Sequence, residues 1–431
     1  RNLTIQNASS DGINAYQSTG AWTVSDATIT DSNKGIMPIG STGDWRITSV
    51  DMRNVSTGIE GDGSTGAWEI DGATIRDARN EGIDFASSSG DGTIENTTIV
   101  DSVDGINLER TSGNWTVRSS QIRNVSSTGI DMRASGGQWT IEQTNISQTG
   151  NNGIELHDSR GNWTIKDTLI NDIGSDAVFG ENTTGDWIID NVGIRDTEDM
   201  GIEVDNSTGD WTVNGTLISG VGEDGIEAED TGGNWEVTNS TVQRAGNNAI
   251  DARGAANQWR VNRSILQDAA AAGIAADGAV EGDTNFNYWG SDDGPSGKYD
   301  GTGAAAVGNV QVKTYYTDRS LTDIGRQTQE LTLTANKTNV KLGDTVKFTV
   351  NDSTGDPVSG ATVAFELGDT NGTTNASGSI NLSITAARTS QSDIRVEARD
   401  ENSDFQTIPD SIDLTVGSAI NLNTTSVNYD G

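Results

Sequence analysis

Acidic side chains recur at a fixed spacing along most of the 431-residue chain. In a first row, each member directly follows an isoleucine: Glu60, Asp84, Asp131, Glu155, Glu203, Glu227 and Asp251. A second row lies two residues further on: Asp62, Glu109, Arg133, His157, Glu181, Asp205, Glu229, Arg253 and Asp277. Ca²⁺ takes about six to eight oxygen ligands, so stacked carboxylates are suited to hold it. We predict Ca²⁺ as a cofactor at Glu203, Asp205, Glu227 and Glu229.

The single histidine lies in the second row, where a base, an acid and a cation converge. The candidate catalytic group is therefore Asp131, Arg133, Glu155, His157 and Glu181. The competing interpretation is a solvated acidic face, because a chain with 63 acidic residues fills outward positions with carboxylates by default. Repeat length varies by only one residue, and long insertions that could wall a substrate cleft are missing. This regularity favours the second interpretation.

Two sequence patterns with the same repeat length indicate which strands and turns position these rows. Tryptophan recurs every 23 or 24 residues, with Gly92 at the one vacant position: Trp22, Trp45, Trp68, Trp115, Trp139, Trp163, Trp187, Trp211, Trp235 and Trp259. A Gly-Ile pair keeps the same spacing and begins at Gly12, Gly35, Gly58, Gly82, Gly105, Gly129, Gly153, Gly201, Gly225 and Gly273. A repeat of this length is the signature of a solenoid.

Within each repeat, apolar and polar residues alternate with a period of two, as in residues 202–205. Such alternation predicts short strands with one buried face. Three strands per repeat, joined by Gly, Asn, Asp and Ser turns, predict one coil of a parallel β-helix. No coil can bury its apolar side alone, so about twelve stacked coils must share one core. The tryptophans then form an internal ladder.

The repeat resembles the right-handed parallel β-helix proteins that include pectate lyase-like enzymes and many secreted archaeal and bacterial surface proteins. The resemblance covers residues 1–317, and motifs such as Asn287-Tyr288-Trp289 resemble the end motif that closes such helices, here at 281–317. It implies that carboxylates on this strand face hold calcium or do acid–base work in the polysaccharide lyases of the fold. No position here matches a catalytic motif of that family.

The composition changes after the helix. Residues 318–330 are a polar linker, and alternating strands between Gly, Pro and Asn turns predict a β-sandwich over 331–417. The sequence 355–363 resembles the bacterial Ig-like repeats of adhesins and invasins. Residues 418–431 read as a tail or a lead-in to a further segment. We thus expect an all-β chain with an Ig-like module after the β-helix.

The net charge of −36 and the absence of cysteine exclude several classes of protein. Such a surface cannot neutralise phosphates, so nucleic acid is not an expected partner. Zinc-thiolate sites and disulfides are excluded, and no apolar run reaches the roughly 18 residues of a membrane span. Strong acidity with few lysines is typical of proteins in molar salt, where charge repulsion is screened. We therefore predict a halophilic archaeal type.

Asn-X-Ser/Thr sequons are abundant and predict N-linked glycans on an extracellular or cell-surface protein. The acceptors that we single out are Asn96, Asn114, Asn162, Asn182, Asn206, Asn239, Asn336 and Asn375.

Residues 1–5 read as the third strand of a coil already under way, which suggests end-to-end assembly with other copies or with surface-layer components. The predicted function is a structural or adhesive glycoprotein, such as a filament or surface-layer subunit. Two alternatives stay open: a polysaccharide lyase or epimerase acting on uronic-acid polymers at the acidic face, and a non-catalytic carbohydrate-binding protein.

Overall fold

The computed structural model describes residues 3–326, 328–341, 343–352, 355–365, 371–384, 393–399, 406–408 and 410–416. The chain divides into two compact units, Arg1–Gly325 and Arg326–Gly431, and the division falls inside the linker predicted at 318–330. Within the described ranges, no helix is long and apolar enough to cross a membrane. The predicted tail, 418–431, lies outside the described residues.

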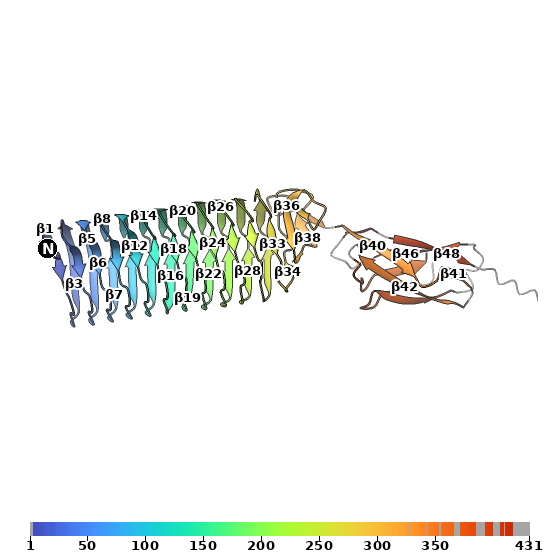
Figure 1. The fold of residues 1–431 in the computed structure, drawn as a ribbon, viewed down its shortest axis with the longest axis horizontal. Coiled ribbons are helices and arrows are strands. Elements are labelled where there is room, and N and C mark those ends of the chain that lie inside the picture. Colours follow the sequence, from blue (N-terminus) through green and yellow to red (C-terminus); the bar gives the residue numbers. More distant parts are fainter. Residues whose placement is uncertain are drawn as a thin grey trace, which may run out of the picture. The chain divides into compact units, whose positions relative to one another are not determined.

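The first unit is a parallel β-helix, as predicted, in which successive coils lie side by side (Figure 1). Each coil contributes one strand to a 14-stranded sheet that carries the acidic rows. Its strands, in spatial order, are β2 (Ile13–Asn14), β4 (Lys34–Met37), β6 (Thr57–Glu60), β9 (Glu81–Asp84), β12 (Asp104–Asn107), β15 (Ile130–Asp131), β18 (Ile154–Glu155), β21 (Val178–Phe179), β24 (Ile202–Glu203), β27 (Ile226–Glu227), β30 (Ile250–Asp251), β33 (Ile274–Ala276), β36 (Gly303–Gly308) and β35 (Pro295–Gly297).

The other two strands of each coil belong to a 23-stranded sheet, in which each strand pairs with its equivalent one coil away. The strands of the tryptophan row are β3 (Trp22–Thr30), β5 (Trp45–Val55), β7 (Trp68–Asp71), β10 (Gly92–Glu95), β13 (Trp115–Arg118), β16 (Gln138–Glu142), β19 (Asn162–Lys166), β22 (Trp187–Asp190), β25 (Trp211–Asn214), β28 (Trp235–Thr238), β31 (Trp259–Asn262), β34 (Gly282–Asp283) and β37 (Val310–Gln311). The long strands β3 and β5 also enter the third row, with β1 (Leu3–Gln6), β8 (Thr74–Ala78), β11 (Thr98–Ser102), β14 (Gln121–Val125), β17 (Asn145–Thr149), β20 (Leu169–Ile173), β23 (Gly193–Thr197), β26 (Leu217–Val221), β29 (Thr241–Ala245) and β32 (Ile265–Gln267).

The tryptophans form the internal ladder that their spacing predicts. Trp163, Trp187 and Trp211 are 2–3% exposed, and successive ring centroids lie 4.6 and 4.8 Å apart with nearly parallel planes. At the vacant position, the Trp115 ring lies over Gly92 and 5.2 Å from that of Trp68. Phe85, directly after β9, packs beside both rings, 4.1 Å from Trp68 and 5.3 Å from Trp115. The ladder therefore continues past Gly92.

The corners of the coil need residues with positive φ, and asparagine and aspartate supply many of them. One such column contains Asp158, Asn182, Asn206 and Asp230, all with φ between 53° and 59°. Short polar side chains tolerate this left-handed conformation better than bulky ones. This requirement explains why the turns of the repeat are rich in Asn, Asp and Gly.

Residues 281–317 continue the strand rows, although the tryptophan spacing is broken there. Ala306 in β36 pairs with Ile274 in β33, and β37 pairs with β34. Trp289 is fully buried, against the Cα of Gly273. The strands β38 (Thr314–Tyr316) and β39 (Ile324–Arg326) then form a two-stranded sheet. The predicted closing segment is therefore also a further coil of the rod.

The second unit contains two sheets around one core, in which Phe348 and Phe365 are buried. One sheet has the order β45 (Ser379–Ser383), β42 (Thr345–Asp352), β40 (Thr328–Ala335) and β47 (Gln406–Ile408). The other has the order β41 (Asn339–Val340), β48 (Asp410–Val416), β46 (Asp393–Arg399), β43 (Thr362–Phe365) and β44 (Asn371–Thr373). The Ig-like character of this unit stays a prediction from the sequence.

Candidate functional site

The two acidic rows lie on the outer face of the 14-stranded sheet. Each first-row residue pairs in register with its equivalent in the next coil, as Glu203 does with Glu227 and Glu227 with Asp251. The isoleucine before each of them is fully buried in the core. Because side chains alternate across a strand, the carboxylates must point away from the core.

The first row is nevertheless much less exposed than a solvated acidic face would be. Glu155 and Glu227 are each 8% exposed, and Asp251 is 0% exposed. The alternation along the strands predicts that outward residues are exposed, and for these carboxylates that prediction is wrong. The flanking residues cover them: the second row lies on one side, and on the other lie the residues two positions before the first row's buried aliphatic residue, among them Asp176 and Asp224. This third row is mixed in composition, and its acids were not among the predicted site residues.

Four of the five candidate catalytic residues meet at one place. His157 Nδ1 lies 3.0 Å from Glu155 Oε1, and Arg133 Nε lies 3.7 Å from the same oxygen. Arg133 also contacts both oxygens of Asp131, with Nε at 3.0 and 2.9 Å, and these hydrogen bonds raise the pKa of the guanidinium further. Nδ1 is buried beside Glu155, and Nε2 lies 3.9 Å from Asp158 Oδ2. In the tautomer with the proton on Nδ1, Nε2 is the nitrogen that can accept a proton.

Glu181, the fifth candidate, lies one coil further on. The Asp158 N–H donates to the Glu181 backbone oxygen at 3.0 Å. Across the described part of the β-helix, no hydrogen bond or ion pair joins the Glu181 carboxylate to the other four candidates. Thr128 takes a place that the sequence analysis did not foresee, because its hydroxyl donates to Glu155 Oε2 at 3.2 Å.

A dense cluster of carboxylates lies three coils beyond His157. Ligand oxygens of Asp205, Glu227 and Glu229 lie within 4.8 Å of one another, and so do those of Asp224, Glu227 and Asp251. Glu227 belongs to both triads. Glu203, which the sequence analysis placed in the site, pairs in register with Glu227 but belongs to neither triad. We call the five residues in the two triads the carboxylate cluster.

The pKa values of Glu203, Asp205, Asp224 and Glu227 are shifted upward. Burial, reinforced by neighbouring carboxylates, raises the pKa of Glu203 to about 9 and that of Glu227 to about 8. Burial also raises the pKa of Asp205 to about 6. Each charge is withdrawn from water and repelled by the others. The cluster therefore needs protons or a cation to offset its charge.

The carboxylate cluster fits a hard divalent cation such as Ca²⁺. All of its donors are carboxylate oxygens, which Ca²⁺ prefers. Glu227 is about nine-tenths buried, and its carboxylate points among the other four and has no hydrogen-bond or ion-pair partner within the described β-helix. Arg253 contacts two members: Asp251, through Nε at 2.9 and 2.8 Å, and more distantly Glu229, whose Oε2 lies 3.9 Å from Nη2.

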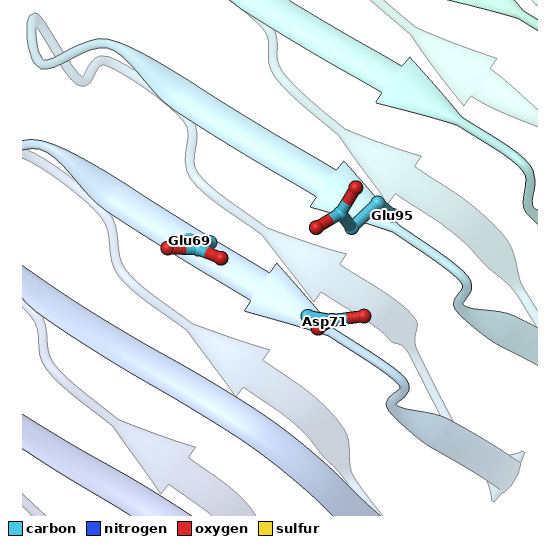
Figure 2. Close-up of side chains that lie close together, drawn as sticks. All are labelled: Glu69, Asp71 and Glu95. Carbon is cyan, nitrogen blue, oxygen red and sulfur yellow. The ribbon is translucent and has the colours of Figure 1, made fainter.

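A third acidic group lies on the other sheet. Figure 2 shows Glu69 and Asp71 on one strand and Glu95 on the next, with ligand oxygens within 4.8 Å of one another. Two arginines offset this group: Arg46 lies 2.9 Å from Glu69, and Arg118 forms an ion pair with Glu95. The balanced charge makes it a weaker candidate for a cation site than the carboxylate cluster.

All eight predicted glycan acceptors are exposed. Two of their side-chain amides donate to neighbours: Asn96 to Asp71 and Asn239 to Asn214, each at 2.9 Å. Exposure is what a glycan acceptor requires. Glycosylation itself stays a prediction.

Comparison with known proteins supports the fold. The family model described as "Right handed beta helix region" matches residues 57–185 and 104–266. The first unit of this chain is therefore a right-handed parallel β-helix built of repeats. A double mutant of the periplasmic alginate epimerase AlgG has a similar structure, with a TM-score of 0.50 and 11% identity over 62% of this chain and 76% of that one.

Two other similar structures have lower scores. The mannuronan C-5 epimerase A-module from Azotobacter vinelandii gives a TM-score of 0.46 and 12% identity, covering 68% of this chain and 87% of its own. A pectate lyase gives 0.41 and 12%, covering 57% and 70%. No curated protein matches the chain. At these identities the similarity shows the fold alone.

Proposed function

We propose that this protein binds a uronic-acid polymer along the outer face of the 14-stranded sheet and acts on it as a lyase or an epimerase. The observation that carries the proposal is the convergence of Arg133, Glu155 and His157 within 3.7 Å contacts. Several β-helix proteins of similar structure are named as epimerases or lyases, which agrees with the proposal. The case rests on the residues of this chain.

The three side chains provide the groups that are needed to remove a proton from C5 of a uronate, the carbon that bears the carboxylate. His157 Nε2 takes the C5 proton, while Glu155, next to Nδ1, stabilises the imidazolium that forms. Arg133 is placed to neutralise the uronate carboxylate as negative charge spreads into it. In a lyase, the C5–H electrons form the C4=C5 double bond, the C4–O4 bond breaks and the leaving oxygen takes a proton. In an epimerase, C5 regains a proton on its opposite face.

A polyanion meets strong repulsion on an acidic face, so the carboxylate cluster matters for binding as well. A divalent cation held by Asp205, Glu227 and Glu229 would supply positive charge for a uronate carboxylate. The cluster and His157 lie on the same face and three coils apart, or about 14 Å at the usual strand spacing. One extended polymer running along the coils can therefore reach both.

The test is turnover of polygalacturonate and polymannuronate in molar salt with and without Ca²⁺. Lyase activity appears as ultraviolet absorbance of the unsaturated product, and epimerisation as a change in the proton NMR spectrum. We expect His157→Ala to abolish turnover and Glu198→Gln, an exposed change at another corner, to leave it intact. Binding without turnover in the wild type would favour the carbohydrate-binding alternative. Turnover that survives in His157→Ala would contradict the proposed mechanism.

A structural or adhesive role is the second candidate, and the regularity of the coils favours it. Pairing keeps the same register from β12 to β33, so the acidic face has no inserted loop to wall a cleft. In this case the chain is a cell-surface glycoprotein that assembles with its own copies or with surface-layer components in high salt. Filaments or sheets in electron micrographs at molar salt, with no turnover of either polymer, would support it. A monodisperse monomer would count against it.

A further inference from the structure

An aromatic side chain interrupts the acidic row between the catalytic candidates and the carboxylate cluster. Phe179 in β21 pairs in register with Glu155 on one side and with Glu203 on the other. It therefore occupies the position at which the neighbouring coils carry a carboxylate. Phe179 is partly exposed, whereas Val178 before it is fully buried and fills the core position of this coil.

The position of Phe179 has no evident role in the core. An apolar ring on a charged outer face leaves carbon surface in water, which costs about 25 cal/mol for each Å² that could have been buried. Its aromatic neighbour is His157, with ring centroids 5.5 Å apart and planes tilted by 59°. A tilted contact of this kind covers one edge or face of a ring and leaves the rest open.

We propose that Phe179 is the platform on which one sugar ring of the bound polymer stacks. The negative face of an aromatic ring attracts the polarised C–H bonds on the apolar face of a pyranose. A sugar on Phe179 would lie one coil from His157 and Glu155 on one side and one coil from Asp205 on the other. Phe179 is thus a positioning residue, which sets the register of the polymer over the groups that act on it. This inference rests on the proposed function.

The order of groups along the face supports the assignment. Arg133, His157, Phe179, Asp205 and Glu227 lie on five successive coils, so each step is about 4.8 Å. Between Arg133 and Arg253, neither acidic row contains a lysine or an arginine. A polymer in this segment therefore meets, in turn, a base, an apolar platform and a carboxylate cluster.

The experiment separates stacking from simple apolar contact by comparing Phe179→Leu with Phe179→Tyr. Leucine keeps the apolar volume but has no aromatic face, whereas tyrosine keeps the face. We expect Phe179→Leu to weaken binding of oligogalacturonate or oligomannuronate by about tenfold in titration calorimetry, and Phe179→Tyr by less than about twofold. If the polymer is turned over, the loss should fall on KM more than on kcat. Phe286→Leu, at an exposed phenylalanine of the closing segment, is the matched control and should have no effect.

The outcomes distinguish this inference from the proposed function. Wild-type binding that is unchanged in Phe179→Leu would overturn the platform and leave the proposed function standing, because the ring would then only cover His157. If the wild type binds neither uronate, a neutral cello-oligosaccharide is the next probe. If Phe179→Leu then loses binding of the cello-oligosaccharide, the platform is supported and the proposed specificity for uronates is contradicted. Binding of none of the three probes would overturn both.

Discussion

Arg253 covers a carboxylate that is buried completely: its Nε lies 2.9 Å from Oδ1 and 2.8 Å from Oδ2 of Asp251. Arg133 contacts Asp131 in the same way, with Nε at 3.0 and 2.9 Å. The two arginines enclose the segment of the acidic face that holds His157, Phe179 and the carboxylate cluster. The negative charge of this segment is therefore concentrated between its two ends, where the arginines offset the charges of Asp131 and Asp251.

The Arg253–Asp251 contact should stabilise the fold measurably. In Arg253→Met, the Asp251 carboxylate stays buried without its counter-charge, so we expect the free energy of unfolding to fall by about 1–3 kcal/mol. We expect less than the largest values for buried pairs, because the Arg253 side chain is 44% exposed and solvent screens it. Arg260→Met removes an ion pair with Glu236 on the exposed surface and should cost less than about 1 kcal/mol. Equal losses in denaturant titrations of the two variants would contradict this prediction.

Stability should fall as pH rises from about 4.5 to about 9. The pKa of Glu203 is raised to about 9 and that of Glu227 to about 8, from an ordinary value of 4.5, by burial and by neighbouring carboxylates. Over this range the folded chain binds more protons than the unfolded chain, so the stability that these two groups contribute is present below the unfolded pKa and is lost with rising pH. The measurement is Tm against pH in metal-free buffer. Glu203→Gln and Glu227→Gln should each flatten the curve, and an unchanged slope in both would refute the assignment.

Calcium should stabilise the protein through the carboxylate cluster. A ligand that binds only the folded state adds about 2.7 kcal/mol at a hundred times its Kd, so Tm should rise with Ca²⁺ concentration. Glu227→Gln should remove most of this rise, because Glu227 belongs to both triads. Glu69→Gln is the control, since that group is already offset by Arg46 and Arg118. A full response to Ca²⁺ in Glu227→Gln would exclude the cluster as the site.

Phe85 should be as important as a ladder tryptophan. Its ring is fully buried and contacts those of Trp68 and Trp115, so Phe85→Ala should cost about 3–5 kcal/mol in the free energy of unfolding. Gly92→Trp alone should also destabilise, because a Cβ at this position would approach the Trp115 ring to 2.3 Å. In the double variant, the space that the Phe85 ring leaves beside Trp115 lets the Trp115 ring move away from residue 92, so part of the loss should be recovered. Thermal unfolding of the three variants measures this coupling, and strictly additive losses would argue against it.

Much of this architecture could be predicted from the spacing of residues alone. In a solenoid, residues one repeat apart become neighbours in the next coil, so a period of 23 or 24 residues translates directly into contacts. The pairing of Trp163 with Trp187 and of Glu203 with Glu227 follows from this rule. The predicted group at Arg133, Glu155 and His157 follows from it as well, because its members lie on adjacent coils.

Only the tertiary structure decided how deeply the acidic rows are buried and which carboxylates converge. Alternation along a strand shows that Glu227 and Asp251 point outward, but their exposure depends on the height of the side chains in the flanking rows. Glu227 entered both triads and Glu203 neither, although the two residues pair in register, and Asp224 joined the cluster from the row before the buried isoleucine. Packing likewise decided that the Trp115 ring covers Gly92, with Phe85 beside it. The periodic sequence thus determined the order of contacts along the rod, whereas packing across it determined burial, charge and the candidate site.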